Sequence, residues 1–248
     1  MGDDNCKTKR NLFARLSGGN PSEHFTSYDG RLDGALPDTS SLLSDVPLLR
    51  RTDIVVTGDP ARVQKLGDAV VTVQKSLAAN PNQQVDMRVT AFMDDCMHTT
   101  GWSTRPVDVR DQLSEWHCFE SETQLVNAFR ATAEEHARRG RIDSVVIIAN
   151  RFDEPLREVQ AAARPLASLG IHIHALVISK AQKLLAQYKA VTDLTKGHSV
   201  AIGSVAAIKE AMPILIFSMF PNTRMRELPA PKDPGVLQLA GLLAAPRR

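Results

Sequence analysis

The stretch that decides the fold is residues 53–60, which read Asp53-Ile54-Val55-Val56-Thr57-Gly58-Asp59-Pro60. Its continuous apolar run is typical of a strand that is covered on both faces. The Asp-Pro pair at its end favours a helix start, because Asp caps a helix N-terminus and Pro suits the first helical position. Apolar residues then recur at helical spacing, at Val63, Leu66, Val70, Val73 and Leu77. These residues predict a strand, a short loop and a long amphipathic helix.

The alternation of strand and helix continues along the chain. Further strands are expected at residues 87–92, 143–149, 171–178 and 199–202, with a short partner for the second strand at 98–102. Helices are expected at 106–116, 122–139, 154–169, 182–194 and 204–212. Connections of this length favour parallel pairing. The sequence therefore predicts an α/β protein with a doubly wound, mostly parallel sheet and helices on both faces.

Two local details lead to specific expectations. Arg88 and Thr90 alternate with apolar residues in the second strand, which is the pattern of a strand with one face exposed. Pro165 falls inside the helix expected at 154–169, and an interior proline costs roughly 3 kcal/mol. A kink or an early end is therefore expected at Pro165.

The ends of the chain differ in composition from its middle. Residues 1–50 are rich in Gly, Ser, Pro and Asp and have no apolar period, so a flexible N-terminal tail is expected there. The domain is expected to span residues 51–220. Residues 221–248 start with a Pro-rich linker and include the apolar run 236–243, which indicates a docking segment. This segment either folds back on the domain or meets a partner, and folding back is favoured.

Composition excludes several classes of protein. Apolar residues make up 43% of the 248 residues and charged residues 23%, which are values typical of a globular protein. The formal net charge is only +2, with the basic residues scattered, so a nucleic-acid surface is not favoured. No stretch approaches the roughly 20 apolar residues of a membrane span. The three cysteines have irregular spacing, which favours a reducing, cytoplasmic setting.

Several motifs, taken in order, are similar to those of the von Willebrand factor A (vWA) domain family. A second strand closes on Ala91-Phe92, Thr123 stands at the start of a helix, and a strand of the Val-Val-Ile-Ile type follows at 145–148. Leu169-Gly170-Ile171 then precedes a strand, and Thr195-Lys196-Gly197 ends a helix. The resemblance covers residues 51–220 and implies a vWA fold, which is a Rossmann-like arrangement.

The resemblance also implies which residues would hold a metal ion. The family uses Asp-x-Ser-x-Ser on the first loop, whereas this chain has Thr57, Asp59 and Ala61 at those places. Thr123 matches the Thr of the second loop, and Asn150 stands where the third loop has Asp. Asp59, Thr123 and Asn150 would hold an ion if one were bound, but a single carboxylate neutralises Mg²⁺ poorly. We therefore predict no metal site and no cofactor.

Open α/β sheets bind ligands at the carboxyl ends of their strands. In the vWA family this rim commonly binds another protein. The resemblance therefore implies a partner-binding rim, formed by the loops at 57–61, 94–100, 123 and 150–153, with Thr57, Gly58, Asp59, Asp94, Asp95, Thr123, Asn150, Arg151 and Asp153 as its main residues. We predict a non-enzymatic, metal-independent interaction module in an intracellular assembly, as a subunit or adaptor. The partner and the oligomeric state are left open.

Two other functions stay open at this point. Asp59 and Asp153 could form an altered metal-dependent adhesion site, and an enzyme that binds a nucleotide or cofactor could use the same kind of sheet. Against an enzyme, the sequence has no G-x-S-x-G elbow, no Walker loop and no H-E-x-x-H motif. No catalytic residue is therefore assigned.

Two groups of residues carry side chains that can bind a soft metal ion such as zinc. Cys96, His98, His117 and Cys118 offer zinc ligands, but their spacing differs from that of common structural zinc sites. His172 and His174 alternate on one strand, with no third ligand near them in the sequence. A structural role is favoured for both groups.

Overall fold

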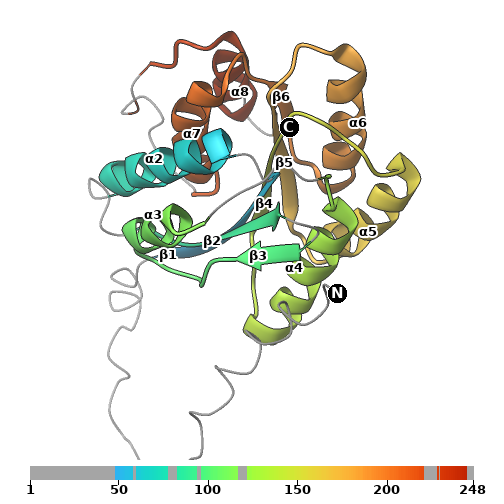
Figure 1. Cartoon of the computed structure of the whole chain (residues 1–248), viewed down its shortest axis with the longest axis horizontal. Coiled ribbons are helices and arrows are strands. Elements are labelled where there is room, and N and C mark those ends of the chain that lie inside the picture. Colours follow the sequence, from blue (N-terminus) through green and yellow to red (C-terminus); the bar gives the residue numbers. More distant parts are fainter. Residues whose placement is uncertain are drawn as a thin grey trace, which may run out of the picture. The chain divides into compact units, whose positions relative to one another are not determined.

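The computed structural model describes residues 48–57, 60–77, 83–93, 96–116, 122–220, 228 and 230–244. The strands of this part of the chain are β1 (Leu48–Thr57), β2 (Gln83–Met93), β3 (Cys96–Thr99), β4 (Ser144–Ala149), β5 (His172–Val177) and β6 (Ser199–Ala201). The helices are α2 (Pro60–Leu77), α3 (Pro106–Ser114), α4 (Leu125–Arg139), α5 (Leu156–Ser168), α6 (Gln182–Thr192), α7 (Ile208–Ser218) and α8 (Pro234–Ala244), with the short 3-10 helices η2 (Asp193–Thr195) and η3 (Val205–Ala207) between them. Strands and helices alternate along the chain as predicted (Figure 1).

The described strands form one six-stranded sheet in the order β3-β2-β1-β4-β5-β6. Neighbouring strands are parallel except at β3, which runs antiparallel along β2. Val56 lies level with Ala91 of β2 and with Ile148 of β4, so the carboxyl ends of the three central strands meet at one edge. The predicted fold class is confirmed.

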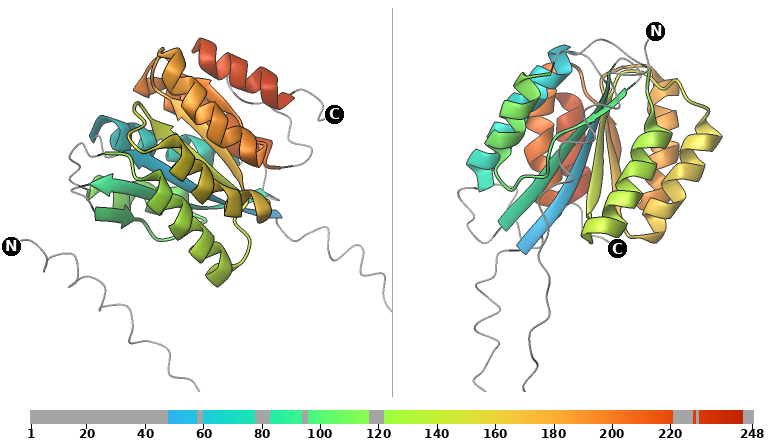
Figure 2. Two further views of the ribbon diagram at one scale, coloured as in Figure 1. Left: turned by 90° about the vertical axis from the view of Figure 1, so that its right-hand side faces the viewer. Right: turned by 60° about the horizontal axis from the view of Figure 1, so that its bottom comes forward.

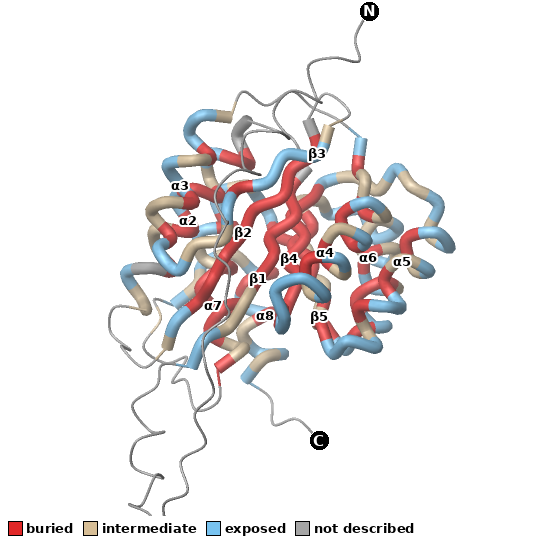
Figure 3. Tube along the Cα trace, turned by 90° about the horizontal axis from the view of Figure 1, so that it is seen from below, coloured by how far each residue is buried: buried red, intermediate tan, exposed pale blue. Residues whose placement is uncertain are grey.

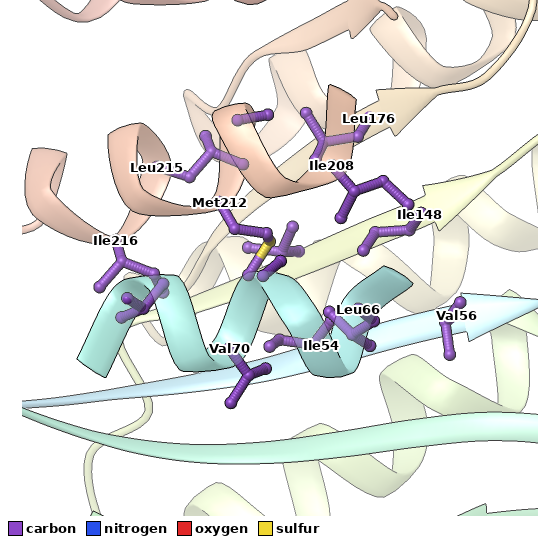
Figure 4. Packing of buried hydrophobic residues seen from close by; sticks show 14 of the residues in the cluster. Ile54, Val56, Leu66, Val70, Ile148, Leu176, Ile208, Met212, Leu215 and Ile216 are labelled. Atoms are coloured by element: carbon purple, nitrogen blue, oxygen red, sulfur yellow. The ribbon is translucent and has the colours of Figure 1, made fainter. Parts of the chain in front are cut away.

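Helices cover both faces of the sheet (Figures 1 and 2). The first face packs against α2, α3, α7 and α8, and the second packs against α4, α5 and α6. On the first face, Leu66 and Val70 of α2 lie over Ile54, with Met212 of α7 beside them (Figure 4). These side chains are fully buried, and each such burial contributes about 1.5–3 kcal/mol.

The expectation that β2 exposes one face is wrong. Arg88 and Thr90 are buried, because α4 lies over this part of the sheet. Both side chains bind the carboxylate of Asp53 in β1, the guanidinium through an ion pair and the Thr90 hydroxyl at 3.1 Å. The hydroxyl of Thr132 in α4 donates to the same carboxylate at 2.9 Å. The polar residues of β2 therefore point into a buried network and not to solvent.

Glu135 of α4 extends this network. Its carboxylate lies 3.6 Å from the Arg88 guanidinium and accepts a hydrogen bond of 3.0 Å from the Trp102 indole. Arg88 also stacks on the Trp102 ring, 5.0 Å from its centroid. Arg138 and Arg139 pair with Glu135 from the solvent side. Burial raises the pKa of Glu135, but the arginine partners outweigh it and hold that pKa below its usual range.

Two helices differ in extent from the expectation. Pro165 does not end α5, which continues to Ser168. The proline gives up its own amide hydrogen bond, but the turn after it is closed by the Leu169 amide, which donates to the Pro165 carbonyl at 3.0 Å. The kink expected as the alternative stays a prediction. α4 starts at Leu125 and not at 122. It ends at Arg139, and the capping residue Gly140 has a φ of 85°, which suits a residue without a side chain.

The helix α8 packs on α7 and covers the free edge of β6. Val236 and Leu239 join the core of the first face. At Gly235 the backbone lies so close to the carbonyl of Ala201 that a Cβ would be 1.7 Å from its oxygen. The Asp233 carboxylate accepts a 2.8 Å hydrogen bond from the Gly203 amide. The apolar run 236–243 thus folds back on the domain.

Replacing Gly235 by Ala should destabilise the protein by about 2 kcal/mol, because the new Cβ would overlap the Ala201 carbonyl. Gly241→Ala in the same helix is the matched control. It has no heavy atom within 4 Å of a Cβ, so it should stabilise the protein by about 0.5–1 kcal/mol through helix propensity. Urea unfolding measures both changes, and equal effects would contradict this placement of α8.

Asp53→Asn should lower the free energy of unfolding by about 3 kcal/mol, because the buried Arg88 keeps only the more distant Glu135 carboxylate, at 3.6 Å, as an acidic partner beneath α4. Asp111→Asn is the control, since Asp111 pairs with Arg110 at the surface and should change stability by less than about 0.5 kcal/mol. Chemical denaturation of both variants tests this. A loss no larger for Asp53→Asn than for the control would show that the buried pair is dispensable.

Candidate functional site

The candidate site is the edge of the sheet where β1, β2 and β4 end, here called the crest. Thr57 closes β1, and Asn150 follows the last residue of β4 at an exposed position. Arg151 and Asp153 continue the loop after Asn150. The predicted rim residues Gly58, Asp59, Asp94 and Asp95 lie outside the described part of the chain. Of the expected loop at 94–100, residues 96–99 form β3.

Thr123 and Asp153 join the second and third crest loops through reciprocal hydrogen bonds. The Thr123 amide donates to the Asp153 carboxylate at 2.8 Å. In return, the Asp153 amide donates to the Thr123 hydroxyl oxygen at 3.0 Å. The loop before α4 and the loop after β4 are therefore held in one fixed arrangement.

Glu154 adds a second connection between these loops. Its carboxylate accepts hydrogen bonds from the amides of Leu125 and Val126, the first residues of α4. These amides have no partner inside the helix, so Glu154 acts as a helix cap supplied from a distant part of the chain. Burial raises the pKa of Glu154, as do the charges of Asp153 and Glu158, although the two amides oppose this rise.

Arg151 neutralises the crest. Its guanidinium Nε lies 2.6 Å from the Asp153 carboxylate. Its backbone carbonyl accepts a 2.7 Å hydrogen bond from the hydroxyl of Tyr188 in α6. Phe152 packs edge-on against the Tyr188 ring, with the ring centroids 5.1 Å apart. The loop after β4 is therefore anchored to α6 as well as to α4.

Tyr188 is a buried donor that stays protonated. Burial raises the pKa of its hydroxyl, and the negative charges of Asp153 and Glu154 raise it further. The positive charge of Arg62, a buried residue in the first turns of α2, acts in the opposite direction. Around Tyr188 the crest thus brings together Arg62, Asp153 and Glu154, and Asp153 forms an ion pair with Arg151.

The described crest residues do not fit a divalent metal ion. The Thr123 oxygen accepts an amide hydrogen bond, and the Asp153 carboxylate carries both an amide and a guanidinium. A cation would have to displace Arg151, which already supplies the positive charge. A hard cation needs several oxygen ligands at once, and the other candidates among the described crest residues, Thr57 and Asn150, are neutral. Asp59 alone, outside the described residues, would have to provide the rest.

His172 and His174, the second group of candidate ligands, make hydrogen bonds within the domain. His172 contacts the Thr195 carbonyl through Nδ1 at 2.7 Å, and His174 accepts a hydrogen bond from the His198 amide at 3.3 Å. Within the described ranges, no three His, Cys, Asp or Glu side chains are grouped closely enough to hold a metal ion. His117 and Cys118 lie outside those ranges, so the predicted packing role of that group stays a prediction.

Sequence reasoning missed the residues that make the crest rigid. Glu154 and Tyr188 belong to no motif, and Arg62 resembles any polar residue of an amphipathic helix. Tyr188 gives the only local signal, because it shares a helix face with the apolar residues Leu184, Leu185 and Val191. Glu154 could not be found, since the helix that it caps starts nearly 30 residues earlier.

Comparisons with solved structures identify the fold. The chain superimposes on a von Willebrand factor type A protein from Catenulispora acidiphila with a TM-score of 0.55 and 10% identity, over 68% of this chain and 42% of that one. It also matches the SpRpn10 VWA domain (TM-score 0.51, 10% identity, 70% and 96% covered). A third match is the pilus adhesin SpaC from Lactobacillus rhamnosus GG (TM-score 0.54, 10% identity, 70% and 30% covered). No protein-family profile and no curated protein sequence matches the chain.

The fold of this chain is that of a vWA domain, and the resemblance found in the sequence is confirmed at the level of the fold. The chain spans less than half of the Catenulispora protein. In the described part of the chain, no helix has the length and apolar character needed to cross a membrane.

Stability should depend on pH through Glu154. The pKa of Glu154 is raised on folding. Above about pH 4.5 the unfolded state therefore loses a proton that the folded state still holds. The free energy of unfolding falls as pH rises from this value through the raised pKa of the folded state. Glu154→Gln has no carboxyl group to titrate at this position. As pH rises, the free energy of unfolding of the wild type should therefore fall relative to that of the variant. Urea unfolding between pH 4 and 7 measures the difference.

Glu134→Gln, on the exposed face of α4, is the control for the loss of a surface charge. If the two variants showed the same pH profile, the half-buried position of Glu154 beneath the start of α4 would be contradicted.

Proposed function

We propose that this protein is a non-enzymatic vWA-type module that binds another protein through its crest and needs no metal ion to do so. The observation that carries the proposal is the Arg151–Asp153 ion pair, with Asp153 and Thr123 also bound to each other. These groups bind one another within the protein. In a metal-dependent module, they would instead bind a cation. A partner would then meet a preformed neutral surface.

The rigidity of the crest supports a role in binding. Its loop after β4 is fixed to α4 by Thr123 and Glu154 and to α6 by Tyr188. A surface that is already ordered loses little conformational entropy when a partner binds. Asn150 is exposed on this fixed loop, and the Arg151 side chain keeps about 36% of its surface accessible. Both side chains can therefore reach a partner.

The proteins that share the fold support the same kind of role. One is named a pilus adhesin, and another, with a TM-score of 0.51, is a proximal thread matrix protein from the mussel byssus. Neither name describes catalysis. Since fold by itself does not determine function, the absence of a catalytic motif in this sequence is the second support for a non-enzymatic role.

The assembly is proposed to be intracellular. The three cysteines have irregular spacing and do not form the pattern of a disulfide framework. A module of this kind would act as a subunit or adaptor whose crest meets a second protein.

Isothermal titration calorimetry with Mg²⁺, Mn²⁺ and Ca²⁺ should give no saturable binding, and EDTA should leave the melting temperature unchanged. The reason is that Asp153 is already neutralised by Arg151. Asp59→Ala should behave like the wild type in both measurements. A saturable site that disappears in Asp59→Ala would overturn the metal-free part of the proposal.

A substitution on the crest should remove partner binding without unfolding the domain. Asn150→Arg places a large charged side chain on the exposed loop, so proteins captured by the immobilised wild type should be lost. Ser168→Arg is the matched control, because Ser168 is exposed at the end of α5, next to the amino ends of the strands. Equal capture by the two variants, measured by quantitative mass spectrometry, would show that the crest is not the binding surface.

A further inference from the structure

The two edges of the sheet are protected to different degrees. At β6, the start of α8 covers the outer side of the strand, with Gly235 against the Ala201 carbonyl and Asp233 bound to the Gly203 amide. At β3, none of the described elements lies outside the strand. Figure 3 shows β3 as an exposed strand beside the buried β2. An open strand edge presents unpaired backbone groups to solvent, and proteins usually cover or charge such edges.

The hydrogen-bond pattern shows which backbone groups face outward. The Thr100 amide donates to the Val89 carbonyl of β2 at 2.9 Å. Backbone groups alternate in direction along an antiparallel strand, so His98 also faces β2, whereas Met97 and Thr99 face away. The next outward-facing residue is Gly101, whose amide is taken by the Gln112 side chain at 2.8 Å.

Met97 and Thr99 have no such cover among the described residues. Their amides and carbonyls can therefore pair with another strand. Both residues are exposed, and the Met97 side chain keeps 45% of its surface accessible to solvent. Pairing with another strand would bury part of the exposed Met97 side chain.

The edge is also uncharged. Residues 96–104 contain no Asp, Glu, Lys or Arg. Inward or edge charges are a common protection against strand pairing, and they are missing here. Like charges that face each other across two paired strands destabilise the pairing. Two copies of residues 96–104 carry no such charges, so they can approach each other without this repulsion. This neutrality favours a second copy of the chain over a partner selected by charge.

We propose that β3 pairs antiparallel with β3 of a second copy of the chain, across a twofold axis at His98. Met97 of one copy then faces Thr99 of the other, and their amides and carbonyls bond in both directions. Met97 and Thr99 lie on the α4 side of the sheet, since they pair with Phe92 and Thr90 of β2. Each exposed Met97 is covered by the facing strand, and the pairing joins the two sheets into one and leaves neither β3 edge open.

The pairing strand is short, so the dimer is weak and depends on concentration. Interfaces of small area belong to the class of transient contacts. Dissociation in the micromolar to millimolar range is expected for such contacts. This inference does not rest on the crest, because the crest lies at the ends of the central strands and β3 lies along the side of the sheet.

Sedimentation velocity of the full chain, from about 1 μM to 1 mM, tests the pairing. The weight-average mass of the wild type should rise with concentration toward that of a dimer. Thr99→Pro removes an outward-facing amide, which an edge position tolerates, and Met97→Lys puts a charge on the edge. Both variants should stay monomeric at every concentration, with circular dichroism and melting temperatures close to those of the wild type.

Leu237→Lys is the matched control, since Leu237 is 52% exposed on the outer face of α8. It should dimerise like the wild type, and so should the crest variant Asn150→Arg. A wild type that is monomeric throughout would overturn the proposal. So would dimers that persist in both β3 variants, or a dimer that only Leu237→Lys removes. Loss of the dimer in Met97→Lys alone, with Thr99→Pro still dimeric, would exclude backbone pairing and equally overturn it.

Discussion

The buried ion pair between Asp53 and Arg88 is the interaction on which the rest of the domain depends. It joins β1 to β2 beneath α4. Thr132 donates to the same carboxylate oxygen as Arg88, and Thr90 donates to the other one. A buried charge without its partner is costly, so the helix must dock where its Thr132 and Glu135 can reach the pair. This requirement fixes the position of α4 over the sheet. It thereby places the start of α4, and the loop before it, at the crest.

The crest follows the same rule with different residues. Thr123, Asp153 and Glu154 use their polar groups to hold the two loops together, and Arg151 supplies the positive charge that a cation would bring. The result is a vWA fold whose crest is rigid through internal hydrogen bonds. Under the proposed function, a partner would recognise the shape and the exposed side chains of this surface.

The two proposed contacts of the protein lie on different parts of the sheet. The crest is formed by loops at the strand ends, whereas β3 offers backbone groups along one side. At the opposite side, α8 occupies the corresponding position on β6. The fold therefore covers one of its edges with its own C-terminal helix. The other edge, at β3, is not covered by any element of the described part of the chain. In the proposed arrangement, a second copy pairs with β3 while the crest binds a different protein.

The sequence by itself determined the strand–loop–helix at residues 53–77, the alternation of elements and the fold class, because the periods of apolar residues report local structure directly. It also placed Thr57, Thr123 and Asn150 at the strand ends and loops. Only the tertiary structure decided that Arg88 is buried, that Glu154 caps α4 and that Tyr188 anchors the loop after β4. These roles depend on groups between 28 and 37 residues apart. No local pattern can encode such pairs, since a buried polar side chain and an exposed one look the same in sequence until the packing of helices removes the solvent.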